Sequence, residues 1–292
     1  MKKLIIEARI NEYMMREEGN AHVPYTPEEI AADSVACREA GASIVHFHAR
    51  QPDGAPEHDP AVYAETVRLI RRTSDILVHP TLGFVTLDAP PEARIEHILR
   101  MAKDPAGAPH FAPMDTGSVN VDRYDPVAKR FTSDNLIYKN STGTLHHFAR
   151  EFRAAGLKPS LVCWNIGFTR FAQTLLDSSL VDKPAYLLFI MTDNEYIGGH
   201  PATPEGLRAH LDFLPRSDVE WSAAGFGGNL FRIAGSIIGA GGHISIGIGD
   251  YAYKELGYPT NAAVIREVVS IARQLGREIA SPAETKQILG MK

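Results

Sequence analysis

The sequence predicts an α/β protein of the (β/α)8 TIM-barrel class, with residues 1–292 forming a single domain. Short β-branched runs alternate with longer amphipathic stretches from one end of the chain to the other. This alternation implies a parallel sheet, because a crossover must return the chain to the same edge after each strand. Eight strand–helix units fit a closed barrel, whereas a doubly wound sheet usually has roughly five to seven strands. No linker rich in proline, glycine or serine divides the chain.

The expected strands are the runs in which apolar and β-branched residues concentrate. They are residues 4–10, 43–48, 76–81, 109–114, 159–164, 186–191, 220–224 and 242–247. The first helix is expected to begin at Thr26-Pro27-Glu28-Glu29, where threonine caps, proline takes the first turn and acidic residues face the dipole. Thr203-Pro204-Glu205 repeats this pattern before the sixth helix, and residues 261–275 carry a helical apolar stripe. The long segment 115–137 after the fourth strand is typical of a functional loop.

The composition argues against several classes of partner. Apolar residues make up 44% and charged residues 22% of the chain, which is enough for a large core without disulfides. The net charge is −5 and no basic stripe is present, so neither nucleic acid nor an anionic membrane is an expected partner. The first apolar run ends at Glu7, too early for a signal peptide, and no run approaches a membrane span. Cys37 and Cys163 are widely separated, which favours a reduced, cytoplasmic protein.

The segment Ser43-Ile44-Val45-His46-Phe47-His48-Ala49-Arg50 carries the strongest chemical signal. Residues two apart in a strand point the same way, so both imidazoles are expected to face the barrel interior. They fall at the carboxyl end of the strand, where the active sites of barrels are built. Two histidines at such a position suit zinc, or less specifically another divalent transition metal. The alternative is a pair of core histidines satisfied by hydrogen bonds.

A zinc site needs a third protein ligand and an open position. Candidates at the ends of other strands are Glu12, His79, Asp115 and Asp250, and their spacing does not decide among them. His243 lies too early in the last strand and is expected to be structural.

Other residues placed after strands could contact a substrate. Thr81 could hold a carboxylate or cap a loop, and Asn120, in the segment containing Ser118, could donate to a substrate oxygen or form an Asx-type turn. The loop around Gly227 opens a helix, so its backbone N–H groups could grip phosphate, although glycine also serves tight turns.

Taken together, these segments resemble the β-keto acid cleavage enzyme family of metal-dependent barrels. The resemblance is carried by residues 24–30, 40–50, 53–54, 117–120, 221–227, 241–243 and the helix that starts at Asn261. It implies a zinc-type metal on His46 and His48, and a reaction in which a β-keto acid and acetyl-CoA give acetoacetate and a new CoA thioester. Metal polarisation of the keto oxygen and a nearby carboxylate or water would suit such a retro-Claisen cleavage. A homo-oligomer, a dimer or tetramer, is also implied.

The chain departs from the family pattern at several positions. The family usually ends its eighth strand with Arg-x-Gly-x-Glu-Asp, in which Glu ligates the metal, Arg holds the substrate carboxylate and Asp is catalytic. Here Ser245 and Gly249 replace the Arg and the Glu, and only Asp250 remains. Acidic positions near the fifth strand are altered too, as Ser160, Val162 and Asn165, and a glutamate common after the first strand falls at Met14.

The expected site therefore consists of nine residues with three kinds of role. The expected catalytic residues are Asp250, Thr81 and Arg50, the substrate-binding ones Asn120, Ser118, Glu12 and Gly227, and the metal ligands His46 and His48. One alternative is a metal-dependent hydrolase barrel, although such enzymes carry the H-x-H pair on their first strand. The other is a degenerate barrel that binds a small acid or a CoA ester without catalysis.

Overall fold

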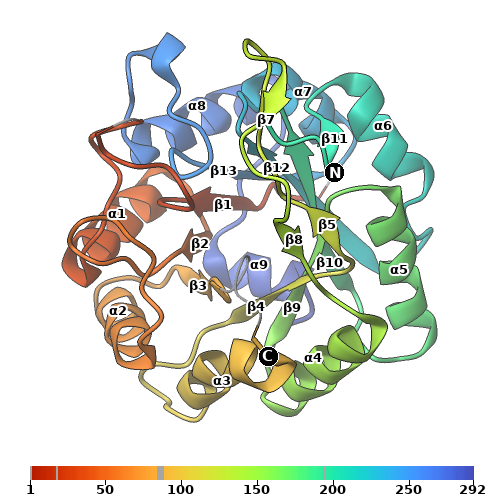
Figure 1. Ribbon diagram of the computed structural model, residues 1–292. Coiled ribbons are helices and arrows are strands. Elements are labelled where there is room, and N and C mark those ends of the chain that lie inside the picture. The colour runs from red at the N-terminus through yellow and green to blue at the C-terminus, as the bar shows by residue number, and fades with distance from the viewer. Residues whose placement is uncertain (1, 18, 84–88, 194) are drawn as a thin grey trace.

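A computed structural model describes residues 2–17, 19–83, 89–193 and 195–292. Within these residues, eight parallel strands form a nearly closed barrel surrounded by helices (Figure 1). The barrel strands are β1 (Ile6–Arg9), β2 (Ile44–Phe47), β3 (Leu77–Pro80), β4 (Phe111–Asp115), β9 (Lys158–Cys163), β10 (Ala185–Thr192), β12 (Val219–Phe226) and β13 (His243–Ile246). Their hydrogen-bonded order is β3-β2-β1-β13-β12-β10-β9-β4. The predicted TIM barrel is confirmed, and each strand overlaps the run predicted for it.

The barrel closes between β3 and β4 through His110. The backbone N–H of His110 donates to the carbonyl of Val78 at 2.9 Å, and its Nδ1 accepts the N–H of Val78 at 3.0 Å. An imidazole nitrogen thus takes the place of a backbone carbonyl in the ladder. The regular pairing stops at this point, yet the two strands remain adjacent.

Most helices surround the barrel, and most begin at a residue whose side chain accepts a backbone N–H of the first turn. Thr26 and Glu29 form the reciprocal capping box of the first helix, and Thr203 accepts from the N–H of Gly206 at the sixth, as these sequences predict. The helices are α1 (Pro27–Ala40), α2 (Pro60–Thr73), α3 (Pro91–Ala102), α4 (Thr142–Ala154), α5 (Ile166–Asp177), α6 (Pro204–Asp212), α7 (Phe231–Gly239), α8 (Asn261–Gln274) and α9 (Pro282–Ile288), with a 3₁₀ turn at Lys254–Leu256. Among the described residues, no helix is long and apolar enough to cross a membrane.

Helix α9, which the apolar pattern did not predict, closes the amino end of the barrel. It lies across the barrel axis in Figure 1 and begins at a capping box made by Ser281 and Glu284. Its Thr285 hydroxyl donates to the Ser43 hydroxyl at 2.9 Å, just before β2. Below the site, a separate core cluster joins α9 to the strands, formed by Ile5, Ile44, Leu77, Phe111, Tyr186, Ala280 and Leu289. The cavity can therefore open only at the opposite, carboxyl end of the strands.

The long segment after β4 crosses that open end. It contains two short antiparallel ladders, β5 (Val119–Asn120) with β8 (Ile137–Tyr138) and β6 (Tyr124–Asp125) with β7 (Arg130–Phe131). In Figure 1 these strands lie in front of the barrel, and β11 (His200–Pro201) extends the sheet beside β10. The N–H of Tyr124 donates to the carbonyl of Glu195, which ties this segment to the loop after β10. The expected functional loop is thus an ordered cover over the barrel mouth.

The buried Arg277 gives a test of how the amino end is held together. Its guanidinium donates to the carbonyls of Lys2 at 3.0 Å and Ile238 at 3.1 Å, and also to that of Gly242. Arg277→Gln should lower the free energy of unfolding by about 2 kcal/mol, because buried carbonyls lose their donors. The exposed Arg273→Gln should change it by less than about 0.5 kcal/mol. Urea denaturation of both variants measures this, and equal losses would contradict the assigned role of Arg277.

Candidate active site

A cavity of about 630 Å³ opens at the carboxyl ends of the barrel strands, beneath the segment after β4. Five of the nine expected site residues line it: Glu12, His46, His48, Arg50 and Thr81. His79, Asp115 and Arg9 line it as well. The remaining four expected residues, Ser118, Asn120, Gly227 and Asp250, lie outside this lining.

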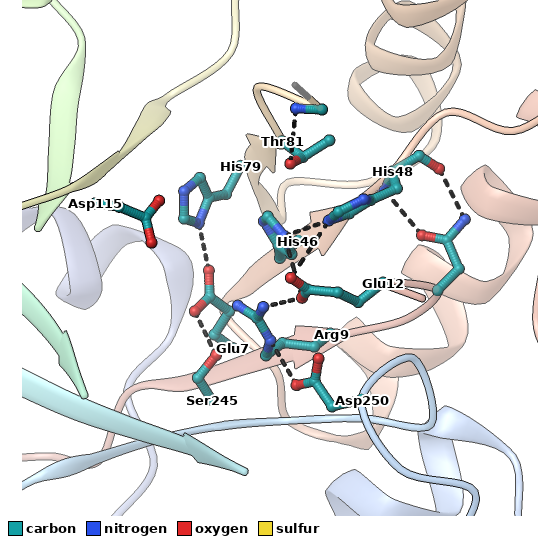
Figure 2. Close-up of polar contacts among 12 residues, drawn as sticks. Glu7, Arg9, Glu12, His46, His48, His79, Thr81, Asp115, Ser245 and Asp250 are labelled. Carbon is teal, nitrogen blue, oxygen red and sulfur yellow. Dashed lines mark hydrogen bonds and ion pairs between the residues drawn. The ribbon is translucent and has the colours of Figure 1, made fainter. Parts of the chain in front are cut away.

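His46 and His48 meet the carboxylate of Glu12 at the mouth of β2 (Figure 2). The two Nε2 atoms are 3.2 Å apart, and the Glu12 oxygens lie 3.5 Å from His46 Nε2 and 3.6 Å from His48 Nε2. Desolvation, followed by the positive charges nearby, holds the pKa of both imidazoles well below the usual value. Both rings are therefore neutral at pH 7, the form in which histidine ligates a metal.

The side chain of Asn11 fixes the backbone that carries His48. Its Oδ1 accepts the N–H of His48 at 2.9 Å, while its Nδ2 donates to the carbonyls of His48 and Pro24. Asn11 is fully buried, so these bonds are not exposed to competition from water. The strand end therefore presents His48 beside His46 although β2 itself ends at Phe47.

The donor set of Glu12, His46 and His48 fits a divalent transition metal. One ligand atom from each of the three lies within 4.8 Å of the others, and the group borders the cavity, which leaves space for a further ligand. Glu7, His46 and His79 form a second such group. There, however, the Glu7 oxygens are already bonded to His79 Nδ1 at 2.6 Å and Ser245 Oγ at 2.5 Å. The group at the cavity mouth is thus the better metal site.

Arg9, which the sequence reasoning did not single out, lies at the centre of the charges in the site. It comes from β1 and is almost fully buried between two acidic side chains. Its Nε donates to Asp250 Oδ2 at 2.6 Å, and its Nη2 pairs with Glu12 (Figure 2). The sequence did contain a signal for Arg9, because it lies within a run predicted to be a buried strand. A buried cation requires acidic partners, so such a residue marks a network of charges. Arg9 thus joins the carboxylates of Glu12 and Asp250 in one network.

Gly249, where the resembled family carries a metal-ligating glutamate, is packed against the segment that carries Glu12. A Cβ at Gly249 would lie 2.2 Å from the backbone nitrogen of Glu12 and 2.5 Å from that of Asn11. The carbonyl of Gly249 accepts the N–H groups of Tyr13 and Met14. No side chain fits at this position, and Glu12 instead supplies a carboxylate to the histidine pair.

Thr81 and Arg50 both line the cavity, but their polar groups are engaged differently. The Thr81 hydroxyl accepts the N–H of Gly83 at 3.2 Å, and within the described part of the chain it donates to no other group. The Arg50 guanidinium donates to the carbonyls of Asn11, Glu12 and Gly54 at 2.7 to 3.0 Å. Arg50 therefore holds together the loops that follow β1 and β2. This geometry suits a positioning role, whereas a catalytic one was expected from the sequence.

Asp250 is buried behind Arg9, outside the cavity lining. Burial raises the pKa of Asp250 to about 6, against the opposing charge and hydrogen bond of Arg9. Its Oδ1 has no hydrogen-bond partner among the described residues. The backbone carbonyl of Asp250 accepts the N–H of Gly227 at 3.1 Å. The expectation of a free N–H at Gly227 for phosphate is therefore not met, and its left-handed φ of 78° indicates a turn glycine.

Ser118 and Asn120 lie beside a second groove rather than in the cavity. The Ser118 hydroxyl accepts the N–H of Asn140 at 2.8 Å. The pairing of β5 with β8 buries Val119 and exposes Asn120, because alternate residues of a strand face opposite sides. The expected contact of these residues with a substrate in the cavity is therefore not supported by their positions.

The far wall of the cavity contains a carboxylate held by aromatic donors. Trp164 Nε1 donates to Asp115 Oδ1 at 2.7 Å, and Tyr138 also donates to Asp115. Burial raises the pKa of Asp115 to about 6, and these two hydrogen bonds oppose the shift. His243, expected to be structural, accepts the N–H of Ile5 at 3.0 Å and lies between Arg277 and Glu220 at the amino end of the barrel.

The close packing of Gly249 leads to a test on stability. Gly249→Ala should lower the free energy of unfolding by about 2 kcal/mol, because the new methyl group must displace the backbone at Glu12. The matched change Gly235→Ala, at a helical position with open space around it, should stabilise by about 0.5 kcal/mol. Both values come from urea denaturation. A Gly249→Ala variant as stable as the wild type would show that a side chain fits there after all.

Comparison with curated proteins finds relatives over the whole length of the chain. The 3-keto-5-aminohexanoate cleavage enzyme of Fusobacterium nucleatum is 30% identical, with 100% of this chain and 99% of that protein covered. The 3,5-dioxohexanoate:acetyl-CoA acetone transferase of Paraburkholderia graminis is 27% identical over 93% of this chain and 90% of its own length. The 3-oxoadipate:acetyl-CoA acetyltransferase of Cupriavidus necator is 25% identical over 98% and 94%, respectively.

A solved structure with the same fold and a match to a protein family support the relationship to these proteins. The apo structure of ObcA superposes with a TM-score of 0.73 over 92% of this chain and 66% of the ObcA chain, at 15% identity, which shows a shared fold. Residues 3–291 match the family described as beta-keto acid cleavage enzyme. This chain therefore belongs to the β-keto acid cleavage enzyme family.

Proposed function

We propose that the protein exchanges acyl groups between a β-keto acid and acetyl-CoA, using zinc or another divalent transition metal on His46, His48 and Glu12. The products would be acetoacetate and the CoA thioester of the acid's acyl group. The observation that carries this proposal is the convergence of two neutral imidazoles and a carboxylate beside the buried Arg9, at the mouth of the cavity. Family membership supports it, as do relatives whose names specify acetyl-CoA. The proposal retains the homo-oligomer, a dimer or tetramer, that the resemblance implies.

The metal, when bound, would act as a Lewis acid toward the keto and carboxylate oxygens of the substrate. The exchange then requires four changes of bonding at the methylene carbon between those two groups. This carbon gives a proton to a nearby carboxylate or water, forms a bond to the acetyl carbon of acetyl-CoA, loses its bond to the original acyl group, and regains a proton to become the methylene of acetoacetate. The CoA sulfur, released from the acetyl group, takes up that acyl group.

The residues around the proposed metal site would serve these changes as follows. Arg9 places a permanent positive charge at the cavity wall, where it would stabilise negative charge that develops on a substrate oxygen. Asp250 lies behind Arg9 and outside the cavity lining, so we assign it the positioning of the Arg9 guanidinium through its Oδ2 rather than direct contact with the substrate. The Thr81 hydroxyl would donate to the substrate carboxylate, and Arg50 would position the loops of the site.

Metal content tests the proposed ligands directly. Protein purified without added metal should contain close to one metal ion per chain by elemental mass spectrometry. His46→Ala and His48→Ala should each reduce this at least about tenfold, and Glu12→Gln should also reduce it, because each change removes a ligand. The exposed His22→Ala serves as the control and should retain the metal. Metal content that is unchanged in the ligand variants would overturn the assignment.

Acyl exchange itself is measured by mass spectrometry of the CoA esters formed from β-keto acids and acetyl-CoA. We expect Asp250→Asn and Arg9→Lys to lower kcat/KM by about 10²-fold or more, because each change weakens the charge stabilisation that Arg9 would provide. Asp177→Asn, at an exposed position of α5, should leave kcat/KM unchanged. Thermal melting confirms that the variants fold. Full activity in Asp250→Asn would remove Asp250 from the mechanism, and hydrolysis without CoA transfer would favour a hydrolase.

A further inference from the structure

The register of the barrel strands divides the cavity into two chemically different halves. On one side, Arg9 of β1 is level with His46 of β2, and His46 is level with His79 of β3. On the other side, Val162 of β9 is level with Asp115 of β4 and Leu188 of β10. Figure 1 shows β1 to β3 on one side of the barrel and β9 and β10 on the other. All six of these residues line the same cavity.

The half of the cavity away from the histidines is lined mainly by apolar side chains, together with Thr132, Ser133 and Tyr138 of the segment after β4. The apolar side chains include Val121, Leu136, Val162, Leu188, Ile190 and Phe226. Val162, Leu188 and Ile190 are all less than a tenth exposed, so they form the floor and wall rather than an outer rim. Among the described residues, no acidic or basic side chain of β9, β10 or β12 reaches this lining.

Two charged residues border this half, and each already has partners. Asp115 accepts hydrogen bonds from both Trp164 and Tyr138. Arg123 lies toward the outside and pairs with Glu195, with an Nε–Oε2 distance of 3.0 Å. A charged substrate group entering here would give up its hydration and would have to compete with these existing pairs. An apolar group would instead gain by leaving water.

We infer that the β-keto acid used by this protein has an uncharged, apolar tail that occupies the half of the cavity formed by β9, β10 and the segment after β4. The inference rests on the proposed function, because the metal and Arg9 fix which end of the acid faces the histidines. With the keto and carboxylate groups held there, the tail points across the barrel toward Val162 and Leu188. Alkyl or aryl tails fit this wall, whereas ammonium and carboxylate tails do not.

Binding without acetyl-CoA tests the inference independently of turnover. Trp164 lines the cavity, so the change in tryptophan fluorescence on adding each acid gives its Kd. We expect 3-oxooctanoate to bind at least about tenfold more tightly than either 3-oxoadipate, with an anionic tail, or 5-amino-3-oxohexanoate, with a cationic tail. Affinity should rise roughly threefold for each methylene added from 3-oxopentanoate to 3-oxooctanoate. The kcat/KM values of the exchange with acetyl-CoA should follow the same order.

A matched pair of variants tests the wall. Ile190→Glu should weaken 3-oxooctanoate binding and strengthen binding of the cationic acid. Ile190→Gln, nearly the same size but neutral, should weaken the former without favouring the latter. If Ile190→Glu does not fold, the wild-type series still decides the question.

Each contrary result has a distinct meaning. Preference of the wild type for the cationic acid would overturn the inference and assign recognition to Asp115. Preference for the anionic acid would overturn it in favour of Arg123. In both cases acyl exchange would still support the proposed function. Absence of exchange and of binding with every β-keto acid would instead overturn the proposed function and the inference with it.

Discussion

The ion pairs of Arg9 are the interaction on which the rest of the site depends. A guanidinium buried at the end of β1 is stable only with acidic partners, and it has two, Glu12 from its own loop and Asp250 from the loop after β13. Because Glu12 is held by Arg9, its carboxylate lies beside the histidines of β2 instead of in solvent. Arg9 therefore sets the positions of the proposed metal ligand Glu12 and of Asp250 together.

The same strand also explains why the barrel interior has a polar side. Glu7, two residues before Arg9 in β1, is fully buried and accepts from His79 on one oxygen and from Ser245 on the other. Burial opposes ionisation of Glu7, but the charge and hydrogen bond of His79 lower its pKa. Glu7, His79 and Ser245 thus hydrogen-bond to one another on the side of the barrel formed by β1, β3 and β13, while Val162, Leu188 and Ile190 line the opposite side of the cavity. This separation allows one end of a substrate to be bound by charge and the other by apolar contact.

Periodicity was sufficient to predict the barrel, because short apolar strands alternate with longer amphipathic helices, most of which begin at a side-chain cap. It also predicted that His46 and His48 face inward, and it included Glu12 among the possible third ligands. The surroundings of Asn120 and Gly227, two of the expected substrate-binding residues, depend on contacts between distant segments. Pairing of β5 with β8 turns Asn120 to solvent, and a carbonyl from the loop after β13 takes the N–H of Gly227. Single-sequence patterns carry no information on such pairings, and Arg9 was overlooked because one of its two partners, Asp250, lies far away along the chain.

The departures from the family motif on β13 form a consistent set rather than the scattered losses expected of a degenerate barrel. Ser245 is a hydrogen-bond partner of Glu7, on the strand paired with its own. Gly249 leaves room for the backbone at Glu12, and Glu12 presents its carboxylate to the same histidines. Arg9 brings a guanidinium to the site from β1, the strand paired with β13. Its ion pairs and the contacts of Glu12 with the two histidines form one buried network, although burial of each group costs desolvation energy. β1 and the loop after it therefore supply charged groups that β13 lacks, which argues against the degenerate barrel.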